Sequence, residues 1–176
     1  MKETVSRLKR DLQYYNIYAD LDNPARFIYG SIVASDEGMV AVKMVSPEGL
    51  YDGVIVMPID KIIRIDTSLP YKKRMEILMR KQSFAEKEIH IDDEDVLVSA
   101  LRCAMEAKTP VSIELVDSGN DNVTGYVTGI SDVICEIDCF DFYGEHEGKS
   151  YMRLDDITQL CFESSDEQVL KMLSEQ

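Results

Sequence analysis

Two stretches of the chain, 55-IVMPIDKIIRI-65 and 150-SYMRLDDITQL-160, share one pattern. Each has an apolar run, a short segment with an acidic residue, and a second apolar run, which is typical of two β-strands joined by a tight turn. The turn segments, Ile59–Ile62 and Leu154–Ile157, lie 95 positions apart. The chain is therefore predicted to contain two related halves.

Glycines keep the same spacing as the two turns. Three pairs stand 95 positions apart: Gly30 and Gly125, Gly49 and Gly144, and Gly53 and Gly148. Self-similarity at a fixed spacing indicates a repeat architecture, so the pattern predicts an internal duplication. We expect two domains, residues 1–88 and 89–176, with the second and third glycine pairs in matching loops between the third and fourth strands. Domains this small bury little surface alone, so we expect each to pack on the other or on a second chain.

Each half is predicted to contain a helix, five short strands and another helix. Helical spacing of Val5, Leu8 and Leu12 predicts the first helix, and the apolar stripe over residues 96–105 predicts its counterpart. Runs of β-forming residues between turn residues predict the strands. They fall near residues 16–20, 27–34, 39–45, 54–58 and 62–65, then near 111–116, 125–130, 134–138, 149–153 and 157–162.

Helix boundaries are also indicated by the sequence. Asp92 or Asp93 is expected to cap the helix that opens the second half. Pro70 near the start of one closing helix, and a possible capping box over residues 164–167 in the other, mark where those helices begin.

The stretch Gly30–Met39 resembles the first motif of the Sm-like family, in which a strand glycine precedes an Asp and then a Met. The second half keeps Gly125 and has Gly129 at a second glycine position, but has Ser131 in place of the Asp. Residues 152–157 are similar to the second motif, Ile-Arg-Gly-Asp/Asn-x-Ile, without its glycine, and residues 57–62 lack both Arg and Gly. The resemblance implies a mainly β fold with flanking helices, built as two tandem five-stranded bent-sheet barrels.

The departures from the family bear on RNA binding. In that family the Asn after the first-motif Met and the Arg of the second motif hold an RNA base, but Val40 and Cys135 stand in the Asn place. Apolar side chains cannot read a base edge through hydrogen bonds. Only Arg153 matches an RNA-contacting position, and an exposed arginine paired with a neighbouring acid is the favoured interpretation.

The charge is divided unevenly along the chain. Residues 1–90 hold 14 Lys/Arg and 13 Asp/Glu, whereas residues 91–176 hold 5 and 20, which gives the whole chain its net charge of −14. A nucleic-acid site needs a cationic surface, and the second half repels phosphate. Basic residues gather in the first half on its opening helix (Lys2, Arg7, Lys9, Arg10) and on its closing helix (Lys72, Lys73, Arg74, Arg80, Lys81). Such residues can simply form the solvated face of a helix. Alternatively, they attract an acidic surface, either on a partner or on the second half of this chain.

No catalytic motif is recognised in the sequence. The nearest approach to a metal cluster is Cys135, Cys139 and His146, but the two cysteines alternate along one strand instead of flanking a tight turn. All four cysteines of the chain are interpreted as small buried hydrophobes, and whether Cys135, Cys139 and His146 do more is left open. No cofactor is expected.

Three classes of function remain. The first is a non-catalytic cytoplasmic scaffold or regulatory module that binds a protein partner or self-associates as a homo-oligomer. The alternative is a divergent Sm-like RNA-binding protein that uses the basic helices of the first half and Arg153, and the net charge disfavours it; an enzyme is third. No stretch approaches the length of a membrane span and the first residues lack the apolar core of a signal peptide, so a membrane is not an expected partner. DNA is not expected either, because the net charge is negative.

Overall fold

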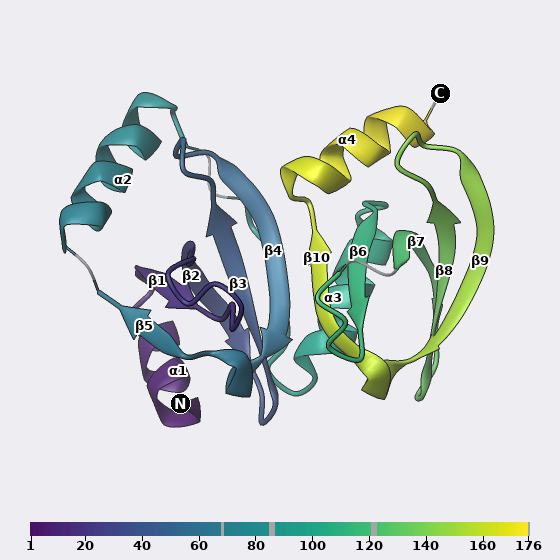
Figure 1. Ribbon diagram of the computed structural model, residues 1–176, viewed down its shortest axis with the longest axis horizontal. Helices are drawn as coiled ribbons and strands as arrows, with labels where there is room; N and C mark the ends of the chain where they lie inside the picture. Colours follow the sequence, from purple (N-terminus) through teal and green to yellow (C-terminus); the bar gives the residue numbers. More distant parts are fainter. Residues whose placement is uncertain (68, 85–86, 121–122, 176) are drawn as a thin grey trace. The chain divides into compact units, whose positions relative to one another are not determined.

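A computed structural model describes residues 1–67, 69–84, 87–120 and 123–175, and Figure 1 shows the order of their elements. These residues contain ten antiparallel strands and four α-helices, so the fold is mainly β as expected. The chain divides into two compact units, Met1–Val96 and Leu97–Gln176, each with five strands. The sequence had placed the boundary after residue 88.

The first unit is a five-stranded antiparallel sheet with a helix before it and a helix after it. The strand order is β5-β1-β2-β3-β4. The elements are α1 (Lys2–Arg10), β1 (Tyr14–Tyr18), β2 (Ile28–Ser35), β3 (Met39–Val45), β4 (Tyr51–Pro58), β5 (Arg64–Asp66) and α2 (Leu69–Lys81). A short 3-10 turn, Ile59–Lys61, joins β4 to β5 at the tetrapeptide that the sequence marked.

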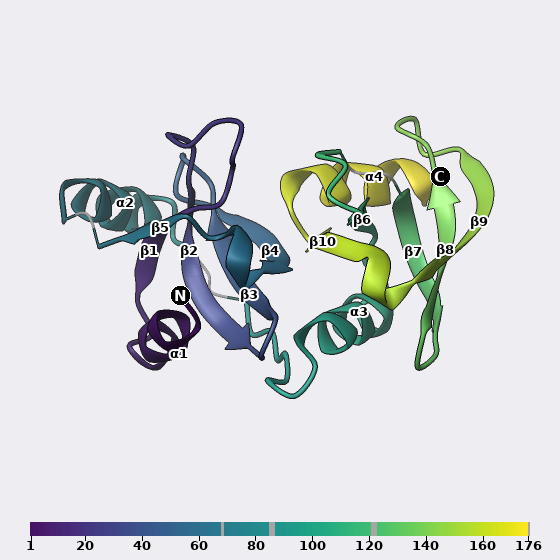
Figure 2. The ribbon, with the colours of Figure 1, turned by 60° about the horizontal axis from the view of Figure 1, so that its bottom comes forward.

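The second unit has the same order of elements, with strands arranged β10-β6-β7-β8-β9. Its elements are α3 (Val96–Glu106), β6 (Val111–Leu115), β7 (Val123–Ile130), β8 (Ile134–Phe140), β9 (His146–Arg153), β10 (Ile157–Phe162) and α4 (Ser165–Ser174). A 3-10 turn again joins the fourth and fifth strands, at Leu154–Asp156. Figure 2 shows the same elements from a second direction.

Strand registers recur between the units at the 95-residue spacing. The bulge of β2 against β3, between Ile32 and Ala34, recurs in β7 between Val127 and Gly129. The first strand differs: Tyr15 lies opposite Gly30, whereas Val111 lies opposite Gly125, which makes the spacing 96 there. The strands of the two units thus pair in the same way, except that the first unit has one more residue than the second between its first strand and its strand glycine.

The expected closed barrels are not confirmed, because neither sheet closes on itself. The two outer strands of the first unit are β5 and β4. Among the described residues β5 pairs only with β1 and not with β4. In the second unit β10 pairs with β6 and likewise not with β9. A strand as short as Arg64–Asp66 has all three residues paired with β1 and offers few further backbone groups for closure.

Several local expectations need correction. Leu12 does not belong to the buried stripe of α1: it follows the end of the helix with φ of 48° and is 83% exposed. The expected cap Asp93 instead binds the Lys9 ammonium and accepts the backbone N–H of Ser35 at 2.9 Å. The first N–H of α3, on Val96, donates to the carboxylate of Asp36 at 2.9 Å.

Other expectations are confirmed. The capping box of α4 forms, with Ser164 as the cap and Glu167 reaching back to the Ser164 N–H. The strands β3 and β10 have the expected bounds. The predicted loop position is correct for Gly49 and Gly144 and wrong for Gly53 and Gly148, which lie inside β4 and β9, beside register shifts and with positive φ.

The closing helix of each unit packs on the hairpin between the third and fourth strands. Gly49 has φ of 87°, and a Cβ there would lie 2.7 Å from the Cβ of Leu78 in α2. Gly144 has φ of 83°, and its Cβ would lie 2.6 Å from the Cβ of Leu173 in α4. Glycine is thus required for both its backbone conformation and the space it leaves.

We expect Gly144→Ala to destabilise the protein more than Gly119→Ala. Both glycines have positive φ, but a Cβ at Gly119 would meet nothing within 4 Å. Both variants therefore share the cost of a left-handed residue, and only Gly144→Ala adds overpacking against α4, which costs roughly 1–3 kcal/mol. Urea unfolding measures the difference, and equal unfolding free energies for the two variants would show that the helix does not press on this turn.

Candidate functional site

The positions that would hold an RNA base in the Sm-like family are buried. Val40 and Cys135 have no exposed surface, and they lie opposite Met57 and Met152 on the neighbouring strands. Burial raises the pKa of the Cys135 thiol to about 11. These side chains are therefore closed to a nucleotide as well as unable to read one.

Arg153 ends β9, opposite Ile134, and its side chain is exposed. The sequence interpretation paired it with a neighbouring acid, and this is wrong for the described part of the chain, where Arg153 makes no ion pair. It is an isolated cation at the end of a strand in the acidic unit.

The five predicted cations of α2 divide into two groups. Lys72 donates to the side-chain oxygen of Gln13 at 2.8 Å, and Arg74 donates to the carbonyl of Pro47 at 3.4 Å. Lys73, Arg80 and Lys81 are exposed and form no ion pair within the described ranges.

Helical spacing puts most of these cations on one face of α2. Ile77, 49% exposed, follows Lys73 by four residues and precedes Lys81 by four, so all three lie on one stripe. We call this surface the cationic face of α2; it consists of Lys73, Arg74, Ile77, Arg80 and Lys81.

In the second unit the turn between β8 and β9 carries two exposed aromatic residues that the sequence analysis missed. Phe142 is 85% exposed and Tyr143 is 75% exposed, and their rings meet edge to face with centroids 5.6 Å apart. Asp141 fixes the turn, since its Oδ1 accepts the N–H of Tyr143 at 2.9 Å and that of Glu145 at 2.8 Å. We call Phe142 and Tyr143 the aromatic tip.

The aromatic tip lies at the same end of its unit as α4, because Gly144 closes on Leu173. On α4, Val169 and Met172 precede Leu173 by four residues and by one, and both are more than half exposed. Phe142 and Tyr143 on the turn, with Val169 and Met172 on the helix that the turn approaches, are what we call the apolar patch. Exposed aromatic and apolar side chains that gather in one place mark interaction surfaces more often than scattered ones do.

The corresponding positions of the first unit have no aromatic residue, and two of the four are charged. At the 95-residue spacing, Pro47 and Glu48 stand in place of the aromatic tip, and Arg74 stands in place of Val169. Ile77, in place of Met172, is a large apolar residue as well. The apolar patch is therefore a property of the second unit and not of the shared fold.

The charged residues close to the apolar patch along the chain are mainly carboxylates, with the partly exposed Lys171 between Val169 and Met172. Glu145, Glu147 and Asp166 are exposed and close to it along the chain. Residues 97–176 contain 5 Lys/Arg and 16 Asp/Glu, a net charge of −11. The surface thus combines apolar contact area with a negative rim.

Strand β9 is exposed beside this patch and pairs with β8 alone among the described strands. Two of its basic side chains contact acids of β8 on the sheet surface: His146 Nε2 lies 2.7 Å from Asp138, and Lys149 binds Glu136. The hydrogen bond from Lys149 lowers the pKa of Glu136, and the same bond raises the pKa of Lys149. None of the described strands pairs with the outer edge of β9.

No metal site emerges from the predicted residues. Cys135 is buried, Cys139 is partly buried and His146 is engaged with Asp138, and no group of three potential metal ligands occurs within residues 1–67, 69–84, 87–120 and 123–175. The interpretation of all four cysteines as buried is correct only for Cys135, since Cys103, Cys139 and Cys161 are partly exposed.

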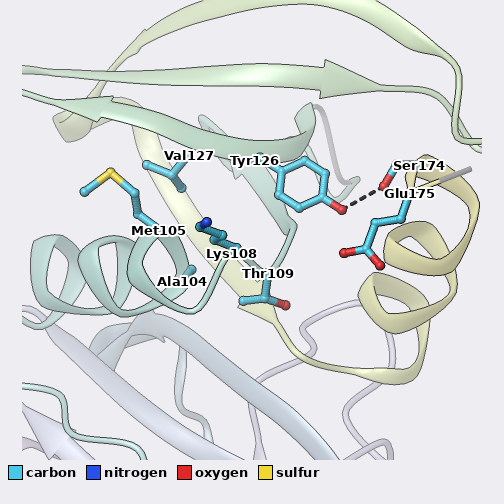
Figure 3. Close-up of a pocket in the computed structure, with 8 residues that line it drawn as sticks. All are labelled: Ala104, Met105, Lys108, Thr109, Tyr126, Val127, Ser174 and Glu175. Carbon is cyan, nitrogen blue, oxygen red and sulfur yellow. Dashed lines mark hydrogen bonds between the residues drawn. The ribbon is translucent and has the colours of Figure 1, made fainter.

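A pocket of about 320 Å³ lies between the ends of α3 and α4 and strand β7 (Figure 3). Tyr126 Oη and Ser174 Oγ are 2.7 Å apart at its wall. One cation, Lys108, and one carboxylate, Glu175, line it together with small and apolar side chains. None of these groups pairs a nucleophile with a base, so the pocket offers no catalytic arrangement.

Comparison with known proteins gives no further guide to function: no protein-family model matches the chain, and neither a curated protein nor a solved structure matches it significantly. Over the described residues, no helix has both the length and the apolar character needed to cross a bilayer.

We expect Cys135 to resist alkylation in the folded protein. At pH 8 its pKa of about 11 leaves little thiolate, and burial blocks the reagent, whereas the partly exposed Cys139 on the same strand is open to it. Iodoacetamide labelling followed by peptide mass spectrometry should show Cys139 modified well before Cys135, and all four cysteines modified in urea. Equal rates in the folded protein would contradict the burial of this position.

Proposed function

We propose that the chain is a non-catalytic protein-interaction module, built by internal duplication from two divergent Sm-like units, and that the apolar patch of the second unit is its binding surface. The observation that carries the proposal is the aromatic tip, two largely exposed rings on a turn that Asp141 holds in place. Four cysteines that form no disulfide in the described residues fit a reducing compartment, so the proposal includes a cytoplasmic location.

The energetics favour burial of the aromatic tip by a partner. Each aromatic side chain offers about 150–250 Å² of surface, and burial yields about 25 cal/mol per Å². Covering most of both rings would therefore contribute on the order of 7 kcal/mol before the entropic cost of association. Because Asp141 already orders the turn, binding loses little backbone freedom there.

The position of the patch suits a partner site for a second reason. Asp141, Gly144 and α4 fix the tip on the folded unit, and the neighbouring edge of β9 has backbone groups that a partner strand could pair with. Apolar contact area with an acidic rim selects partners that are apolar and positively charged.

We expect Phe142→Ser with Tyr143→Ser to abolish partner binding without unfolding the protein. Both side chains are mainly exposed, so the free energy of unfolding should stay within about 0.5 kcal/mol of that of the original protein. Affinity capture of the tagged full chain, with quantitative mass spectrometry, should lose specific partners in this variant and keep them in Leu12→Ser. Leu12 is a matched control, because it is 83% exposed and belongs to the other unit. Identical partner lists for the two variants would exclude the aromatic tip as the binding site.

RNA binding through the cationic face of α2 is the second candidate, since Lys73, Arg80 and Lys81 are exposed and unpaired within the described residues. Against it stand the buried Val40 and Cys135 and the net charge of −14. Binding by this helix alone would be phosphate contact with steep salt dependence and little base preference.

We therefore expect no saturable binding of mixed-sequence single-stranded RNA at physiological salt. At low salt, any residual binding should fall when Lys73, Arg80 and Lys81 become Glu, and should change little with Arg153→Ala. Fluorescence anisotropy titration measures both. Binding that persists as salt is raised, or that requires Arg153, would favour the RNA-binding alternative.

A further inference from the structure

The cationic face of α2 and the apolar patch occupy corresponding places in the two units. Helices α2 and α4 each close on the hairpin glycine of their unit, through Leu78 and Leu173. At the 95-residue spacing, Ile77 of α2 corresponds to Met172 of α4. One structural surface thus occurs twice in the chain with different side chains.

The two versions of this surface are complementary in charge. On α2, the exposed cations Lys73, Arg80 and Lys81 lie on the same face as the exposed Ile77, outnumber the one exposed acid there, Glu76, and pair with no acid in the described residues. Near the apolar patch, the exposed carboxylates are Glu145, Glu147 and Asp166, and the one nearby cation, the partly exposed Lys171, lies between Val169 and Met172. Opposite charges arranged around apolar centres steer association and set its orientation.

The two surfaces also suit each other in the contacts that arginine and apolar side chains can make. Arginine favours the faces of aromatic rings, and the first unit already shows this, with Arg64 lying 3.9 Å from the ring centroid of Tyr18. The largely exposed rings of the aromatic tip offer the same kind of face to an arginine of α2. Ile77 is then placed to bury itself against Val169 and Met172.

We propose that the partner of the apolar patch is a second copy of this chain, whose cationic α2 face docks on it. This inference rests on the proposed function and adds the identity of the partner. Each copy carries both surfaces on different units, so the contact is heterologous. Two copies can form a closed dimer in which both contacts are made. Otherwise each copy binds a different neighbour and a longer assembly forms.

The first test is the mass of the full chain in solution. Sedimentation equilibrium at micromolar concentrations should show a dimer or larger species at low salt and weaker association at high salt, because salt screens the charged rim. A monomer at every concentration and salt tested would overturn the proposal. Association that strengthens with salt would also overturn it.

Two variants test which surfaces meet. Lys73→Glu with Arg80→Glu should weaken self-association at least about tenfold, and so should Phe142→Ser with Tyr143→Ser. Each variant keeps one intact surface, so an equimolar mixture of the two should form a heterodimer that neither forms alone. The absence of that heterodimer, with both variants folded by circular dichroism, would show that these two surfaces do not bind each other.

Charge reversal provides a positive control against loss of folding. Glu145→Lys with Glu147→Lys should also weaken association, and combining it in one chain with Lys73→Glu and Arg80→Glu should restore association to within a few fold of the original. A matched reversal away from both surfaces, Lys61→Glu, should leave the mass unchanged. No recovery in the combined variant would count against the proposed pairing.

This experiment separates the inference from the proposed function. A monomeric chain that still captures other proteins through Phe142 and Tyr143 would refute self-association while supporting the interaction module. A chain that neither self-associates nor captures a partner through these residues would refute both.

Discussion

The contact between Gly144 and Leu173 determines what the second unit presents to its surroundings. With no Cβ, the turn between β8 and β9 comes so close to α4 that a side chain at residue 144 would lie 2.6 Å from the Leu173 Cβ. The turn is therefore seated on the helix, and the residues on either side of the contact belong to one surface. Without this approach, Phe142 and Tyr143 would be two aromatic residues on a free loop, and Val169 and Met172 an isolated helix face.

The same contact recurs between Gly49 and Leu78, where it supports a different surface. The hydrogen bonds of the turn are also repeated: Gly49 N–H donates to Ser46, and Gly144 N–H donates to Asp141. Because backbone geometry fixes the frame, side chains at the tip are free to vary at little cost in stability. The first unit has Pro47 and Glu48 there, next to a helix rich in cations, and the second has two aromatic residues with carboxylates nearby. One frame thus supplies two surfaces of opposite character.

Much of the fold could be predicted from the sequence, because glycines, turns and apolar alternation record backbone geometry directly. The spacing of Gly30 and Gly125 locates the second strand of each unit, where a side chain would meet the carbonyl of Lys43 or Asp138 within 2.5 Å. Failures came where the deciding contact lies far along the chain. Asp93 has the composition of a helix cap, but Lys9 and Ser35 compete for it successfully.

The candidate site was harder to predict, since exposure depends on packing that the sequence does not state. Helix α2 was recognised as basic, but the sequence could not show that Lys72 and Arg74 are engaged with Gln13 and Pro47. The aromatic tip did leave a signal: two adjacent rings follow Asp141 in a turn, at positions where the first half has Pro47 and Glu48. Two adjacent exposed aromatic residues on an ordered turn are the kind of surface that mediates protein contacts. The net charge of −14 does not oppose the use of that surface, because screening over about 8 Å at physiological salt leaves contact between two faces to their local charges.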